Sequence, residues 1–190
     1  MRLKLAFVAP ATAALAGLAL CSVLVLRTSQ ALFSATTATP AESWATGSVV
    51  ITDDDGGIAL FDTATDGNLT GGQSLQRCIT ITYNGTLTTN AQVFLYGTAT
   101  GTLLPYLNLA VDRGSGASSA SCVGFTLIPT AVYSGRFSDF PASTFETGLG
   151  PWLPGSTGAS IVYRFAITVQ SVAVAQSKTA TGAFTWEARA

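Results

Sequence analysis

The feature that most constrains the fold is the strict alternation of side chains over residues 161–170. One set of alternate positions is apolar and consists of Ile161, Tyr163, Phe165, Ile167 and Val169. The other set is smaller or more polar and consists of Val162, Arg164, Ala166, Thr168 and Gln170. A period of two residues is typical of a β-strand, whose successive side chains point to opposite faces. The stretch therefore predicts a strand with one buried face, which requires a second layer to cover it.

Shorter strand-like runs, separated by turn signals, occupy most of the remaining chain. The acidic and glycine-rich residues 53–57 and the pair Asn84-Gly85 are examples of such turn signals. The predicted strands in chain order are residues 47–51, 58–61, 78–83, 92–96, 106–111, 122–128, 132–137, 161–170 and 183–187. We expect residues 143–159 to form one long loop, and residues 171–180 a loop or a short helix. About nine strands without a convincing amphipathic helix predict an all-β fold, a two-sheet β-sandwich of jelly-roll or immunoglobulin-like type.

The N-terminus has the composition of an export leader. Arg2 and Lys4 precede an uncharged, mostly apolar stretch over residues 5–26. The apolar region of a secretory signal spans about 7 to 15 residues and a membrane-spanning helix needs about 20, so this stretch is compatible with either. Ser29 and Ala31 place small residues where a signal peptidase requires them.

We therefore predict cleavage between Ala31 and Leu32, with an uncleaved membrane anchor as the alternative. The predicted organisation is a signal peptide or anchor helix over residues 1–31, an extended segment over residues 32–46, and the sandwich over residues 47–190. Lipid attachment at Cys21 is a third interpretation. It is disfavoured because Leu20 is large where the lipoprotein peptidase prefers a small residue.

Composition excludes several classes of function. Only 10% of the residues are charged, the formal net charge is −1, and the chain contains no histidine. Nucleic acid is not expected as a partner, because phosphate binding needs a clustered cationic surface. Without histidine the commonest general base and the commonest metal ligand are both missing. We expect no enzymatic activity and no cofactor, and contact with a membrane only through the leader.

Two cysteines, Cys78 and Cys122, remain after removal of the leader. Outside the membrane such a pair forms a disulfide more often than a redox or metal site. A disulfide between them would close a loop of about 45 residues, which stabilises the fold by about 4 kcal/mol in the chain-entropy treatment. We predict a disulfide between them.

The acidic run Asp53, Asp54 and Asp55 admits two interpretations. Clustered carboxylates suit Ca²⁺, with Asp62 or Asp66 as further ligands, but the spacing does not match an EF-hand loop. Aspartate and glycine also favour turns for local reasons. A solvated turn is the default expectation, with no metal bound, and calcium is the alternative.

Aromatic residues offer a further alternative, a sugar-stacking surface. In a sandwich such residues are mostly core, and we expect this for Trp186 and Tyr163. Trp152 lies between prolines in the predicted long loop and is the strongest candidate for an exposed contact.

Several phrases together resemble a known family. The leader junction reads ALFSATTATPAESWATGSVVITD, the body contains CITITYNGTL, YLNLAV and VYSGRF, and the chain ends in FTWEA before its last residues. This chain resembles the secreted proteins of Gram-positive bacteria that carry a SipW-type signal peptide, the TasA and camelysin (CalY) family. The resemblance covers the leader and most of the body, and its most specific parts are the leader junction and the FTWEA ending.

The resemblance implies a jelly-roll subunit of an extracellular, biofilm-type matrix fibre. In that arrangement the N-terminal segment inserts as a strand into the next subunit, and here the segment is residues 32–45, with Leu32, Phe33 and Ser34 near its start and Trp44 near its end. A free extended segment can complete the exposed sheet edge of another copy, and head-to-tail insertion does not close. The alternative is that residues 32–45 form a first strand or a disordered tail of a monomer.

The resemblance also raises a peptidase activity, because camelysin relatives carry a metallopeptidase label. A chain without histidine has no His-Glu-x-x-His helix, so we do not carry that activity over. The leading expectation is an exported structural protein of the cell surface or matrix, with self-association or another surface protein as its partner. The runner-up is a monomeric secreted module that binds a surface glycan or protein.

Overall fold

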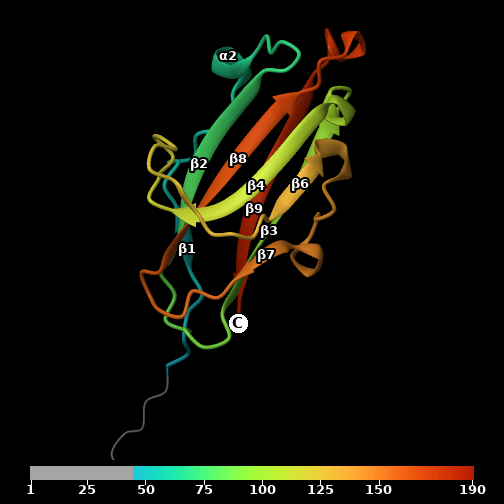
Figure 1. Ribbon diagram of the computed structural model, residues 1–190. Coiled ribbons are helices and arrows are strands. Elements are labelled where there is room, and N and C mark those ends of the chain that lie inside the picture. The colour runs from blue at the N-terminus through green and yellow to red at the C-terminus, as the bar shows by residue number, and fades with distance from the viewer. Residues whose placement is uncertain (1–44) are drawn as a thin grey trace, which may run out of the picture. The chain divides into compact units, whose positions relative to one another are not determined.

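The computed structural model describes residues 45–190, which fold as two antiparallel β-sheets packed face to face (Figure 1). The strands of the larger sheet are β1 (Ile51–Asp53), β2 (Ser74–Tyr83), β8 (Ser160–Val169), β4 (Leu107–Ser115), β5 (Thr126–Leu127) and β6 (Tyr133–Arg136). Those of the smaller sheet are β7 (Leu149–Trp152), β3 (Gln92–Gly101) and β9 (Ala180–Arg189). The short helices are α2 (Thr63–Asp66), η1 (Leu104–Tyr106), η2 (Phe137–Asp139), η3 (Phe145–Thr147) and η4 (Ala173–Ala175). The prediction of an all-β, two-sheet sandwich is confirmed.

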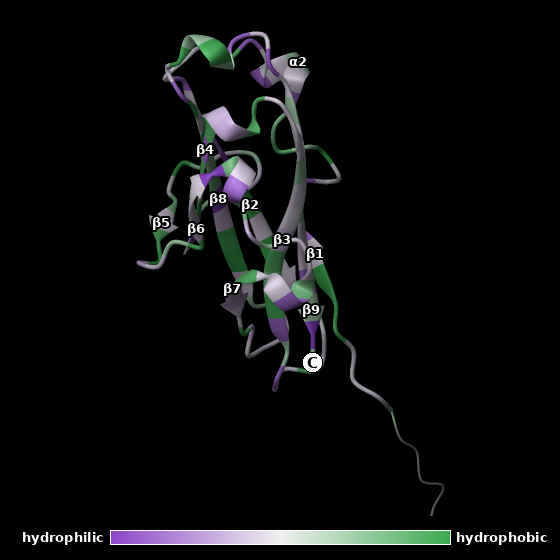
Figure 2. Ribbon diagram, turned by 90° about the vertical axis from the view of Figure 1, so that its right-hand side faces the viewer, coloured by the Kyte–Doolittle hydropathy of each residue, from purple (hydrophilic) through white to green (hydrophobic). Residues whose placement is uncertain are grey.

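The strand predicted from the alternation of residues 161–170 is confirmed as β8, and it is the centre of the larger sheet. It pairs along its length with β2 on one side and with β4 on the other. Tyr163 and Phe165 are fully buried on its inner face, and they pack with Ile79 of β2 and Leu95 of β3. Figure 2 shows the apolar residues concentrated in the middle of β8 and β3. The core therefore lies between the two sheets at the level of β8.

The chain crosses between the sheets repeatedly. The consecutive long strands β2, β3 and β4 alternate between the larger and the smaller sheet, and the neighbours of β8 come from distant parts of the sequence. In the smaller sheet β3 is central, with β7 on one side and the C-terminal strand β9 on the other. Strand β9 is thus an edge strand.

Four local predictions are wrong. Of the predicted strand 47–51 only Ile51 lies in a strand, because β1 begins there. Residues 58–61 form no strand and cross one side of the sandwich as irregular chain. Of the predicted strand 122–128, only Thr126–Leu127 forms a strand, β5, which pairs with β4. The predicted long loop 143–159 contains η3 and β7. Proline and glycine made β7 look like a loop, but an edge strand tolerates proline.

Candidate functional site

The outer edges of β2, β7 and β9 differ in how they are protected against pairing with another strand, and this difference identifies the candidate site. Strand β1 pairs only with Ile81, Thr82 and Tyr83, so the edge of β2 beyond them has no strand beside it. The first backbone N–H past that ladder, that of Thr80, donates to Oδ1 of Asp54 at 2.8 Å. Farther along, Arg77 pairs with Asp66. The segment that follows β1 therefore binds one edge N–H of β2 through Asp54 and the side chain of Arg77 through Asp66.

The edge strand β7 is protected by a different device. Pro151 has no N–H to donate, and the carbonyl oxygens of Gly150 and Pro151 accept hydrogen bonds from Nη1 of Arg113 at 3.1 and 2.7 Å. Arg113 belongs to β4 of the opposite sheet. Short edge strands, prolines and side chains bound to edge carbonyls all prevent the addition of a further strand.

Strand β9 has none of these protections. It is 10 residues long and contains neither lysine nor proline. Its only strand neighbour is β3, and within residues 45–190 no backbone hydrogen bond connects its outer edge to another segment. A long, unprotected edge strand is a template for pairing with another chain.

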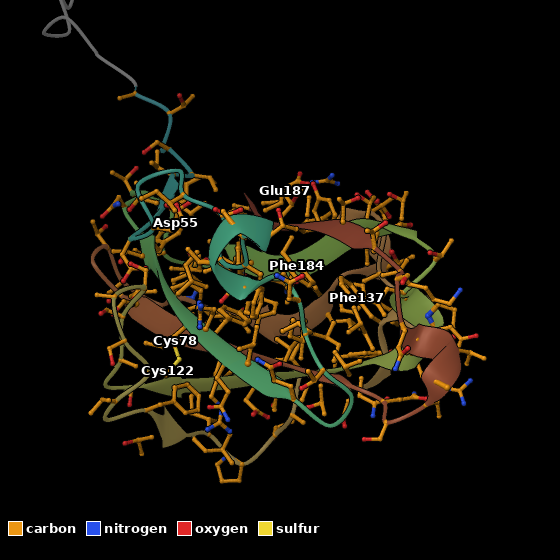
Figure 3. All side chains as sticks on the ribbon, turned by 90° about the horizontal axis from the view of Figure 1, so that it is seen from above. Asp55, Cys78, Cys122, Phe137, Phe184 and Glu187 are labelled. Atoms are coloured by element: carbon orange, nitrogen blue, oxygen red, sulfur yellow. A yellow bond between two sulfur atoms is a disulfide. The ribbon has the colours of Figure 1, made fainter. Side chains whose placement is uncertain are left out.

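A groove of about 690 Å³ runs beside this edge. One side is β9, from Ala180 to Phe184 and at Trp186. The other side is residues 53–63, which we call the groove wall. The floor consists of Ile79, Leu107, Phe137 and Ile167. Figure 3, seen from above, places Asp55 of the wall to one side and Phe184 and Phe137 to the other.

The β9 side of the groove is aromatic, whereas the wall combines apolar residues with the carboxylates of Asp53, Asp55 and Asp62. The ring of Phe184 stacks on that of Phe137 at 5.6 Å between centroids and lies 4.5 Å from that of Phe165. Although their side chains pack on the core, Phe184 and Trp186 are only half-buried. On the wall, Ile58 is 72% exposed. The core is thus left open along this side, and the groove suits an extended peptide that pairs with β9 and places apolar side chains on the floor.

Two of the three acidic residues that suggested calcium, Asp54 and Asp55, accept hydrogen bonds from backbone N–H groups. Oδ1 and Oδ2 of Asp54 accept the N–H groups of Thr80 and Ser119 at 2.8 and 2.9 Å, and Oδ1 of Asp55 accepts that of Gly57 at 2.7 Å. Burial raises the pKa of the Asp54 carboxyl, but the two backbone donors outweigh it and hold the pKa below its ordinary value. Burial, followed by the charge of Asp55, raises the pKa of Asp53. In the described part of the chain no group of three acidic or cysteine side chains is arranged to hold a metal ion.

Cys78 and Cys122 form a disulfide, with their Cα atoms 5.3 Å apart, in agreement with the prediction. Cys78 lies on the outer face of β2, where it is 1% exposed. Residues 116–125, which we call the strap, cover that face. Phe125 of the strap lies over the guanidinium of Arg164 at 4.6 Å, and Arg164 pairs with Asp112 at 2.7 Å. The disulfide therefore fixes a surface segment to the outside of the larger sheet.

The aromatic residues do not form a sugar-stacking surface around Trp152. Trp152 ends β7, pairs with Val93 and packs against the core, so its predicted place in an exposed loop is wrong. Trp186 packs on Tyr163 at 5.5 Å, and burial raises the pKa of Tyr163 to about 12. Tyr163 is part of the buried core, as expected, whereas Trp186 packs against the core but is only half-buried.

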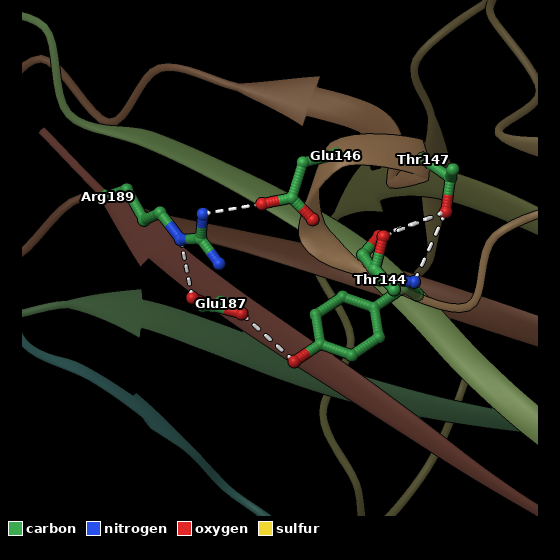
Figure 4. Close-up of polar contacts among 6 residues, drawn as sticks. Thr144, Glu146, Thr147, Glu187 and Arg189 are labelled. Carbon is green, nitrogen blue, oxygen red and sulfur yellow. Dashed lines mark hydrogen bonds and ion pairs between the residues drawn. The ribbon is translucent and has the colours of Figure 1, made fainter.

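A polar cluster fixes the last residues of β9 on the outer face of the smaller sheet (Figure 4). Arg189 donates to Glu187 at 2.7 Å and to Glu146 of η3 at 2.8 Å, and the hydroxyl of Tyr96 donates to Glu187 at 3.0 Å. Hydrogen bonds from Arg189 and then Tyr96 lower the pKa of Glu187. The cluster holds the C-terminal end of β9 in its sheet and leaves the edge at residues 180–186 exposed to the groove.

The remaining predicted site residues lie outside the described part of the chain. They are Cys21, the cleavage pair Ala31 and Leu32, and Phe33, Ser34 and Trp44 of the predicted assembly segment. Among residues 45–190 no helix is long and apolar enough to cross a membrane.

Comparisons with known proteins do not place this chain. No protein-family model and no curated protein matches it.

Proposed function

We propose that this chain is an exported, non-enzymatic structural protein of the cell surface or extracellular matrix, whose copies assemble by strand insertion. The segment of residues 32–45 of one copy pairs with the outer edge of β9 in the next copy and covers the groove. The observation that carries the proposal is the contrast among the edges: of the strands within residues 45–190, β9 combines a long unprotected edge with a largely apolar groove. The resemblance to the TasA and camelysin family points to the same arrangement.

The place where the described chain enters the sandwich supports insertion between copies. The carbonyl of Ser48 accepts the N–H groups of Thr86 and Leu87 at 2.9 and 3.1 Å, and its own N–H donates to Oγ1 of Thr86 at 2.9 Å. Figure 1 shows that this entry lies at the end of the sandwich away from α2, whereas the groove wall runs towards α2. Because the chain enters the sandwich at one end and the groove wall extends towards the other, insertion between copies gives head-to-tail contacts, which propagate instead of closing.

Deletion of residues 32–45 tests the proposal. The exported chain should assemble into fibres visible by electron microscopy, and the deletion variant should remain monomeric in sedimentation. A matched variant with a glycine-serine sequence of the same length in place of residues 32–45 should behave like the deletion. Fibres that form equally well in both variants would contradict the proposal.

The same experiment separates the runner-up, a monomeric module that binds another surface protein in this groove. Such a module would be monomeric with or without residues 32–45. It would also bind its cell-surface partner equally well after the deletion.

A further inference from the structure

The groove wall is anchored through Asp54 to residues that do not line the groove, on β2 and in the strap. Asp53 and Asp55 line the groove, whereas Asp54 between them does not. The two carboxylate oxygens of Asp54 accept the N–H groups of Thr80 on β2 and Ser119 in the strap. The hydroxyl of Ser119 also donates to the backbone carbonyl of Asp54 at 2.6 Å. One residue of the wall is thus fixed simultaneously to the larger sheet and to the strap.

The strap is itself fixed to β2 on both sides of Ser119. Cys122 is joined to Cys78, and the carbonyl of Ala117 accepts the hydroxyl of Thr80 at 3.2 Å. The backbones of Ser118 and Ser121 are hydrogen-bonded in both directions at 3.1 Å, which closes the turn that presents Ser119. A continuous series of contacts therefore leads from the disulfide through Ser119 and Asp54 to the groove wall.

We infer that Asp54 and Ser119 are positioning residues for the groove, and that the Cys78–Cys122 disulfide sets the position of the wall through them. The inference rests on the proposed function for what the groove binds. Burying the apolar residues of the wall under an inserted strand requires the wall to be ordered. A wall that is already fixed binds more tightly because less conformational freedom is lost on binding.

Hydrogen exchange of the backbone amides in residues 55–63 measures how firmly the wall is held, and it does so without any bound strand. In the unassembled full-length chain, Ser119→Ala should accelerate exchange there about tenfold, which corresponds to the loss of one hydrogen bond of ordinary strength. Ser119→Thr, which keeps a hydroxyl, should restore slow exchange. The matched control is Ser118→Ala, because the Ser118 side chain has no hydrogen-bond partner within residues 45–190. Exchange of the β8 amides should not change in any of these variants.

Reduction of the disulfide tests the second half of the inference. In the wild-type chain a phosphine reductant should accelerate exchange in the wall by a factor similar to that of Ser119→Ala. In the Ser119→Ala variant it should add little, because effects that pass through one contact are not additive. Equal exchange in wild type and Ser119→Ala, or a full effect of reduction in both, would overturn the inference.

Assembly gives a separate readout. The concentration needed for fibre formation should rise about tenfold in Ser119→Ala and in Asp54→Asn, and should stay unchanged in Ser118→Ala. If the wild-type chain forms no fibres at all, the proposed function fails, while the exchange measurement still decides whether the strap positions the wall.

Discussion

The edge of β2, which is hydrogen-bonded to the groove wall, and the edge of β9, which lines the groove, are protected to different extents. Beyond β1, Asp54 binds the edge N–H of Thr80, Asp66 pairs with the side chain of Arg77, and a disulfide fastens the strap to the outer face of β2. The outer edge of β9 has no neighbouring strand within residues 45–190, although the groove beside it is lined by the rings of Phe184 and Trp186. Natural sheets generally protect their edges. A fold that binds side chains along the edge of β2 and leaves the outer edge of β9 open is suited to accepting a further strand at β9.

The largest expected effect concerns the protected side. Replacing both cysteines, by Cys78→Ser and Cys122→Ser, should lower the free energy of unfolding by about 4 kcal/mol, because the disulfide closes a loop across the larger sheet. Chemical denaturation monitored by Trp fluorescence measures this. A loss below about 1 kcal/mol would mean that the strap is not fastened to β2 as described.

The second effect concerns the open side. Ile58→Glu places a charge on the groove wall at a residue that is 72% exposed, so the fold should be unaffected. Because insertion would bury that charge, the concentration required for assembly should rise at least about thirtyfold, equivalent to about 2 kcal/mol. Val123→Glu is the matched control, since Val123 is 86% exposed and lies on the strap. Equal impairment by both substitutions would show that general surface charge, and not the groove, limits assembly.

The sequence predicts the region around β2 and the disulfide better than it predicts the region around β9 and the groove. The alternation of residues 161–170 predicts β8, and the paired cysteines predict the disulfide, because both signals are local or compositional. The apolar residues Ile58, Leu60 and Phe61 also predict a strand, but they line the groove as irregular chain. Which strand lacks a neighbour depends on pairings between distant segments, so neither the open edge of β9 nor the groove could be predicted from the sequence.

The smallest expected effect is a dependence of stability on pH at the protected edge. The pKa of Asp54 is lower in the folded chain than its ordinary value of 3.8. Its ionised form therefore contributes stability that is fully present above about pH 4 and is lost as the pH falls through the lowered pKa. Asp54→Asn should be less stable than wild type at pH 6, and the difference should shrink towards pH 2 in urea titrations. A difference that stays constant over this range would assign the effect to packing instead of charge.

The measurement that tests the central claim most directly is a photo-cross-link between copies. A benzophenone side chain introduced at Phe33 of the full-length chain, in fibres grown from a mixture of ¹⁵N-labelled and unlabelled copies, reports by mass spectrometry what the N-terminal segment touches. Strand insertion predicts cross-links of mixed isotope composition to residues 58–61 or 180–186. Cross-links confined to one copy, or directed to the edge of β2 or to the strap, would contradict the assignment of β9 and its groove as the acceptor.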